Sequence, residues 1–81
     1  MDIIEICNNN LIAGLKCLKN NPNYQYLIRF NGIDYTDYST YDEKNEICIF
    51  DKQGNNCSMD LNDFVKKVQD EIITFNVTER R

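Results

Sequence analysis

The sequence predicts an α+β fold, with a helix near each end of the chain and a three-stranded antiparallel sheet between them. Two observations lead to this prediction. Apolar residues recur every three or four positions in both terminal regions, as in helices that bury one face. Between these regions, short segments rich in aromatic and branched residues are separated by turn sequences. We therefore expect one α+β domain over residues 1–81, with the last helix packed on the sheet.

The first 21 residues are expected to form one helix. Their apolar residues fall at helical spacing: Ile4, Cys7, Leu11, Leu15 and Leu18. Asp2 followed by Glu5 resembles a capping box at the start of this helix. Residues 8–10 are three asparagines, which are weak helix formers. The alternative is therefore a short strand at Ile3 to Cys7 followed by a helix from Asn10.

The middle of the chain is expected to form the sheet. Tyr24 to Phe30 has the composition and partial alternation of a strand, and Asn31-Gly32 favours the positive backbone angles of a two-residue hairpin. The chain then returns as a second strand, Ile33 to Tyr41. Both faces of this strand are mixed, which suits an edge position. After a turn at Asp42 to Asn45, Glu46 to Asp51 is a third strand with two apolar faces.

The last helix is the clearest element of the sequence. It follows the polar loop Gln53 to Asn56, and Asp60 is placed to cap it. Its apolar stripe consists of Leu61, Phe64, Val65, Val68, Ile72 and Phe75. We expect this stripe to lie on the sheet and the tail from Asn76 to Arg81 to fray.

The negative charge of the chain is concentrated between Ile33 and Glu46. This stretch has five carboxylates against one lysine, so it holds the whole formal net charge of −4. Three tyrosines lie among the carboxylates. A charge run is usually only a solvated face, but tyrosine supplies rigid contact area at interfaces and carboxylates attract basic surfaces. The sequence therefore predicts a partner-binding surface made of Asp34, Tyr35, Asp37, Tyr38, Tyr41, Asp42, Glu43 and Glu46.

The residue inventory argues against an enzyme and against a bound metal or cofactor. The chain has no histidine, which removes Ser-His-Asp and Cys-His sites and the usual zinc arrangements. Asp51 to Asn55 resembles the start of a calcium loop, but its glycine comes too early and Asn62 stands where a glutamate is needed. Phosphate-binding glycine motifs are missing. Only Cys57, in a polar loop, is a candidate reactive thiol.

Composition also bears on location and partners. The sequence shows neither a basic-then-apolar leader nor an apolar run of membrane-spanning length, so we expect a cytoplasmic protein with reduced thiols and no membrane partner. A pI near 4.6 disfavours direct binding to nucleic acid, because phosphate contacts need clustered Lys and Arg. The expected partner is a basic protein.

In size, charge and expected element order, the chain resembles small acidic inhibitors made by phages and prophages, in particular anti-CRISPR proteins. The resemblance rests on the stretch IDYTDYSTYDEKNE, on the order helix, three strands, helix, and on a composition typical of an AT-rich genome. It implies an inhibitor in the host cytoplasm that occupies a basic surface of a nucleic-acid-binding protein such as a CRISPR effector. The alternative is an assembly domain, in which the tyrosine-rich strand pairs with a second copy to form a homodimer.

Overall fold

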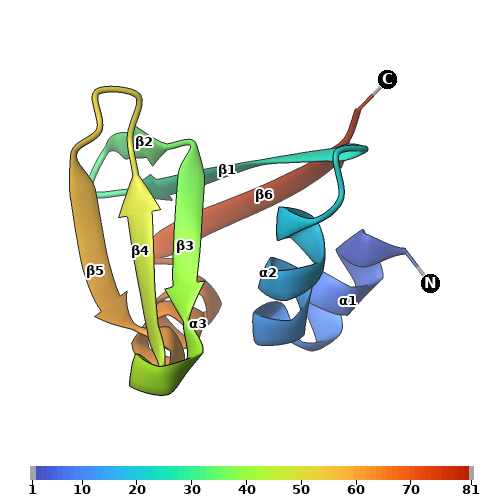
Figure 1. The fold of residues 1–81 in the computed structure, drawn as a ribbon, viewed down its shortest axis with the longest axis horizontal. Coiled ribbons are helices and arrows are strands. Elements are labelled where there is room, and N and C mark those ends of the chain that lie inside the picture. Colours follow the sequence, from blue (N-terminus) through green and yellow to red (C-terminus); the bar gives the residue numbers. More distant parts are fainter. Residues whose placement is uncertain (1, 81) are drawn as a thin grey trace. The chain divides into compact units, whose positions relative to one another are not determined.

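A computed structural model describes residues 2–80, in which three α-helices and six strands follow one another (Figure 1). The helices are α1 (Ile3–Asn9), α2 (Leu11–Lys19) and α3 (Leu61–Gln69). The strands are β1 (Tyr24–Phe30), β2 (Ile33–Tyr35), β3 (Asp37–Tyr41), β4 (Glu46–Phe50), β5 (Asn56–Asp60) and β6 (Ile73–Glu79), and the 3₁₀ helix η1 (Asp42–Lys44) joins β3 to β4. The fold is α+β, as predicted. Within residues 2–80, none of the helices is both long and apolar enough to cross a membrane.

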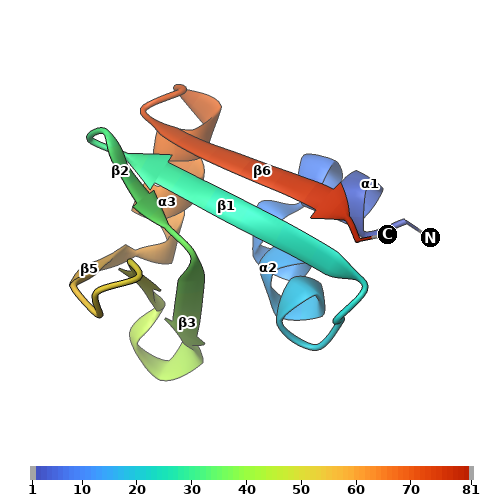
Figure 2. The ribbon, with the colours of Figure 1, turned by 90° about the horizontal axis from the view of Figure 1, so that it is seen from above.

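The strands form two three-stranded antiparallel sheets, so the prediction of a single sheet between two helices is wrong. Sheet A has the order β2-β1-β6 and sheet B the order β3-β4-β5. Figure 2 shows β1 and β6 side by side and running in opposite directions. The residues group into two compact units, Met1–Tyr26 with Val77–Arg81, and Leu27–Asn76. That they fold as one domain stays a prediction.

In the first unit, the predicted N-terminal helix is two helices. Asp2 caps α1 by accepting a hydrogen bond from the Ile4 N–H at 3.1 Å. Asn10 ends α1 because its backbone is extended, with φ −153° and ψ 98°, and its side chain accepts from the Ala13 N–H to cap α2. Asparagine suits this role because its short polar side chain satisfies a free N–H at a helix start. Both the continuous helix and the alternative strand at Ile3 to Cys7 are therefore wrong.

In the second unit, the predicted hairpin is confirmed and the strand after it is broken. Asn31 and Gly32 both have positive φ, 54° and 76°, as a two-residue turn between β1 and β2 requires. The predicted strand Ile33 to Tyr41 is not continuous, because at Thr36 the chain leaves sheet A for sheet B. The Thr36 N–H donates to the Phe50 carbonyl at 2.9 Å. Such a bend lets one stretch of chain serve two sheets.

Sheet B is centred on β4, whose prediction is confirmed. Ile47 and Ile49 have no exposed surface, as expected for side chains on the inner face of a central strand. The loop after β4 was predicted, but β5 was not. Its sequence, NCSMD, is polar at every second residue, and only Cys57 and Met59 are withdrawn from solvent. This alternation is typical of an edge strand. Because the segment is mostly polar, its composition alone suggests a loop.

The last predicted helix is correct at its start and wrong at its end. Asp60 caps α3, as predicted, by accepting hydrogen bonds from two N–H groups of the first turn. The helix ends at Gln69 instead of continuing to Phe75, because Glu71 adopts the left-handed conformation with φ 62°. The segment that follows forms β6 as far as Glu79 instead of a frayed tail, and it pairs with β1. The last residue of the predicted tail, Arg81, lies outside the described residues.

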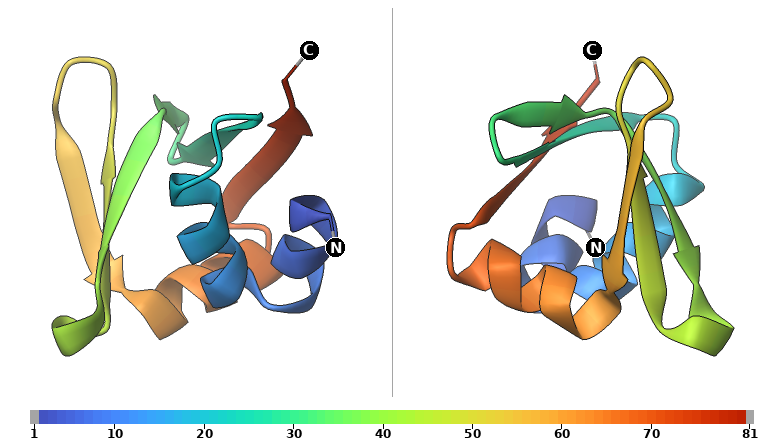
Figure 3. Two further views of the ribbon diagram at one scale, coloured as in Figure 1. Left: turned by 45° about the vertical axis from the view of Figure 1, so that its right-hand side comes forward. Right: turned by 90° about the vertical axis from the view of Figure 1, so that its left-hand side faces the viewer.

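The core of the second unit is built from both sheets and α3. Figure 3 shows α3 lying across the end of sheet B at which η1 is found. Phe64, on the buried side of α3, meets Phe75 edge to face, with ring centroids 6.3 Å apart and planes at 77°. The buried apolar residues of this unit are Ile28, Tyr35, Tyr38, Ile47, Cys48, Ile49, Leu61, Phe64 and Ile73.

Candidate functional site

The pairing register of sheet B separates two faces of different chemistry. Residues directly opposite each other on neighbouring strands point to the same face, as do residues two apart along one strand. One face consists of two rows that are mostly withdrawn from solvent: Tyr38, Ile49 and Cys57, then Thr40, Ile47 and Met59. The other face is polar, acidic and aromatic around the buried Cys48 at its centre, and it is the candidate site.

This outer face consists of three rows across the strands. The rows are Asp37, Phe50 and Asn56, then Ser39, Cys48 and Ser58, then Tyr41, Glu46 and Asp60. The two end rows hold the carboxylates and the rings, and the middle row holds small side chains only. Tyr41 is 46% exposed, Asp37 and Asp60 are exposed, and Glu46 and Phe50 are half-buried. We call Asp37, Tyr41, Glu46, Phe50 and Asp60 the acidic face.

The β3–β4 turn adds two more carboxylates beside the acidic face. Asp42 and Glu43 are exposed in η1, and Asn45 closes the turn in the left-handed conformation with φ 49°. The turn is tied to the start of α3, because the Asn45 carbonyl accepts from the Leu61 N–H at 2.8 Å. In addition, Asn45 Nδ2 donates to Asp60 Oδ2 at 3.3 Å. These bonds hold the turn carboxylates in a fixed position next to the row that ends in Asp60.

The charges of the acidic face and the turn act together. They are the carboxylates of Asp37, Asp42, Glu43, Glu46 and Asp60 against the ammonium of Lys44. With strands about 4.8 Å apart and a rise of about 3.3 Å per residue, the face measures roughly 10 by 13 Å. Asp42, Glu43, Glu46 and Asp60 gather at the η1 end of the face, where neighbouring charges lie within about one Debye length, roughly 8 Å at physiological salt. Their fields add at the surface of an approaching partner. Asp37 lies in the opposite end row, about 13 Å away along the strand.

Replacing Asp60 with alanine is expected to lower the free energy of unfolding by about 1–2 kcal/mol, the usual cost of a lost helix cap. Asp60 Oδ1 accepts from the Asn62 N–H at 2.8 Å, and the same carboxylate holds Asn45. Urea denaturation measures the loss. Asp63→Ala is the matched control, because within residues 2–80 the Asp63 carboxylate accepts no hydrogen bond. Equal losses in the two variants would contradict the capping role.

The structure separates the eight residues that the sequence predicted as the site. Tyr35 and Tyr38 are buried, with exposed fractions of 7% and 1%, so they present almost no ring surface to a partner. Asp34 lies on sheet A, where it accepts a hydrogen bond from Arg29 Nε at 2.7 Å. That hydrogen bond holds the pKa of Asp34 below its usual value. The remaining five are brought together on the acidic face and the turn: Asp37, Tyr41, Asp42, Glu43 and Glu46.

The bend at Thr36 explains why two of the three tyrosines are buried. In a continuous strand, Tyr35 and Tyr38 would point to opposite faces, because their separation is odd. The chain instead changes sheets between them, and both side chains turn inward. Their contribution is to the packing of the core.

Two members of the acidic face were missed by sequence reasoning. Phe50 was expected in a strand with two apolar faces, and Asp60 was expected only as a helix cap. Both belong to the face because β5 pairs with β4 in the register that sets Glu46 opposite Asp60. The alternation within NCSMD is the signal that could have identified β5 and, with it, this register.

The acidic face and the turn present carboxylates and one aromatic ring at the surface. In the part of the chain from residue 2 to residue 80, no three His, Cys, Asp or Glu side chains are grouped so as to hold a metal ion. Four of the five carboxylates of the acidic face and the turn are on exposed residues, namely Asp37, Asp42, Glu43 and Asp60. Such an arrangement suits the binding of a cationic surface.

Comparisons of the chain with protein-family models, with curated proteins and with solved structures gave no match. The function is therefore inferred from the residues of the acidic face and their geometry.

Proposed function

We propose that this protein is a small, non-enzymatic inhibitor that binds a basic protein surface made for nucleic acid, as anti-CRISPR proteins do. The observation that supports this most is the gathering of four carboxylates around Tyr41 on one face and one turn of sheet B. Carboxylates at this density repel nucleic acid and attract clustered Lys and Arg. A CRISPR effector is a partner of this kind.

The aromatic members of the face extend the likeness to nucleic acid. Tyr41 is 46% exposed, and its side chain has only two rotatable torsions, so little conformational entropy is lost when a partner immobilises it. Grooves that bind single-stranded nucleic acid stack bases on aromatic or arginine side chains. The Tyr41 ring can occupy the place of a base while the neighbouring carboxylates occupy the places of phosphates.

The interface is expected to extend beyond the acidic face. A face of about 10 by 13 Å covers roughly 130 Å², whereas a stable interface buries about 800 Å² on each partner. The remaining area is expected to come from η1 and from the edge of β3, which lie next to the face. Steering by the carboxylates makes association fast and sensitive to salt.

Capture of partners from a bacterial lysate that contains a CRISPR effector tests this proposal. The tagged protein is compared with the variant Asp42→Lys, Glu43→Lys, Glu46→Lys at low and high salt, and bound proteins are identified by mass spectrometry. The matched control is Glu5→Lys, Asn20→Lys, Asn23→Lys, Glu79→Lys, which changes the net charge equally at exposed positions outside the face. We expect the wild type and the control to capture a nucleic-acid-binding protein at low salt only. Capture of that protein by the triple variant of the face would contradict the proposal.

The alternative function, an assembly domain, is favoured by one observation. Strand β3 is an edge strand of sheet B, a position at which a second copy could add a strand. Light scattering separates the two functions. A dimer that persists when the three carboxylates are reversed would support the assembly domain, whereas a monomer that captures a basic partner supports the inhibitor.

A further inference from the structure

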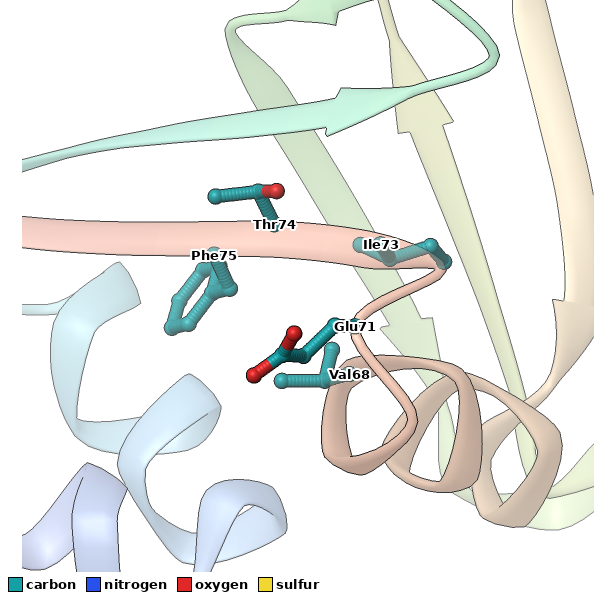
Figure 4. Close-up of a pocket in the computed structure, with 5 residues that line it drawn as sticks. All are labelled: Val68, Glu71, Ile73, Thr74 and Phe75. Carbon is teal, nitrogen blue, oxygen red and sulfur yellow. The ribbon is translucent and has the colours of Figure 1, made fainter.

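We propose that a hollow at the end of α3 binds an arginine side chain of a partner protein. The hollow has a volume of about 360 Å³ and is lined by Val68, Glu71, Ile73, Thr74 and Phe75 (Figure 4). Ligand pockets range from about 300 to 1,000 Å³, so this one has room for a single side chain and not for a large ligand. None of its residues belongs to the acidic face, so the proposal stands apart from the function proposed above.

Glu71 occupies a backbone position that favours glycine. Its φ is 62°, in the left-handed region that side chains with a Cβ seldom adopt. The Glu71 N–H donates to the Val68 carbonyl at 3.1 Å, and the Ile72 N–H donates to the Lys67 carbonyl at 2.8 Å. This pair of bonds is the Schellman ending of a helix, where glycine is the usual residue. Backbone strain of this kind is often found at binding sites, where the side chain has a use that offsets it.

The carboxylate of Glu71 is available to a ligand. Within residues 2–80 it makes no hydrogen bond or ion pair, and the lysine four residues before it, Lys67, is not bonded to it. Figure 4 shows the carboxylate extending from the turn toward the side on which Val68 and Phe75 lie. It is the one charged group among the five lining residues, and three of the others are apolar. The hollow therefore combines one negative charge with walls that suit an aliphatic stem.

Arginine matches this combination better than other side chains. Its guanidinium is planar and weakly hydrated, it can donate two hydrogen bonds to one carboxylate, and it packs flat against aromatic rings. The C-terminal end of α3 adds a partial negative charge that favours a cation near Glu71. Asp70, exposed beside Glu71, adds a further negative charge.

Titration of the whole protein with N-acetyl-arginine amide, followed by NMR, tests the proposal. The control probe is N-acetyl-citrulline amide, which has nearly the same shape and no charge. We expect saturable shifts at the amides of Glu71, Thr74 and Phe75, with arginine binding about tenfold more tightly than citrulline. The substitution Glu71→Gln is expected to remove this preference. Absence of saturable shifts, or equal affinity for the two probes, would overturn the proposal.

The substitution Glu71→Gly separates binding from folding. Glycine relieves the strain at φ 62°, so the Tm is expected to rise by a few degrees while the preference for arginine is lost. A variant that is more stable than the wild type cannot have lost binding through unfolding. Retention of the arginine preference in Glu71→Gly would overturn the proposal, because the carboxylate would then not be the group that binds.

Discussion

Replacing Tyr38 with alanine is expected to remove most of the stability of the unit Leu27–Asn76. Its side chain is 1% exposed and lies opposite Ile49 in the core rows of sheet B. Truncation of a buried aromatic side chain costs about 3–5 kcal/mol, because burial is lost and a cavity remains. A domain of this size has a free energy of unfolding on the order of 5 kcal/mol. Urea denaturation followed by circular dichroism measures the loss.

Tyr41→Ala is the matched control for this prediction. Tyr41 lies on the same strand as Tyr38 but on the opposite face, and it is 46% exposed. Its truncation is expected to change the free energy of unfolding by less than about 1 kcal/mol, as at most surface positions. Equal destabilisation by the two substitutions would show that Tyr38 is not in the core, and the placement of the two tyrosines would be wrong.

Replacing Gly14 with alanine is expected to destabilise the first unit by about 1–3 kcal/mol. In most helix interiors this change is favourable by roughly 1 kcal/mol, because alanine is the better helix former. At Gly14 the sign is reversed by the neighbouring helix. An added Cβ would lie 2.8 Å from Cys7 Cα and 3.1 Å from Cys7 Cβ, and the first of these atoms belongs to the backbone. The two helices would have to move apart to admit it.

Cys17→Ala is the control for the substitution at Gly14. Cys17 lies on the same helix, one turn later, and is exposed, so its replacement is expected to change stability by less than about 0.5 kcal/mol. Thermal unfolding monitored at 222 nm reports on both variants. Stabilisation of the protein by Gly14→Ala, as helix propensity alone predicts, would contradict the close approach of α1 and α2.

Sequence reasoning succeeded where a local rule determines the structure. The caps at Asp2 and Asp60 and the hairpin at Asn31-Gly32 each depend on a few neighbouring residues, and the structure confirms all three. The α+β class follows from the periodicity of longer segments and is also confirmed. These features can be predicted without knowing which strands pair.

Sequence reasoning failed where the structure depends on contacts between residues that are far apart in the sequence. The bend at Thr36 is held by the Phe50 carbonyl, and no local pattern marks residue 36 as the point at which the chain changes sheets. The end of α3 was missed because Glu71 takes a conformation expected of glycine. In both places, tertiary contacts outweigh local preference.

The candidate site was likewise predicted only in part from the sequence. The acidic stretch was recognised from charge alone, and five of its eight residues lie together at the surface. The bend withdraws Tyr35 and Tyr38 from the surface, and the unpredicted strand β5 adds Asp60. Composition can thus identify an acidic segment, but the pairing register determines which side chains share a face.

The most direct test of the proposed function is the dissociation constant of the protein with the nucleic-acid-binding protein that it captures. It is measured for the wild type and for Asp42→Lys, Glu43→Lys, Glu46→Lys. Asp37 and Asp60 are left unchanged in the variant because both have structural roles. The Asp37 carboxylate accepts a hydrogen bond from the Tyr38 N–H at 2.8 Å, and the Asp60 carboxylate caps α3. With about 1 kcal/mol lost for each reversed charge, the variant is expected to bind about 100-fold more weakly at low salt. An unchanged dissociation constant would contradict the account.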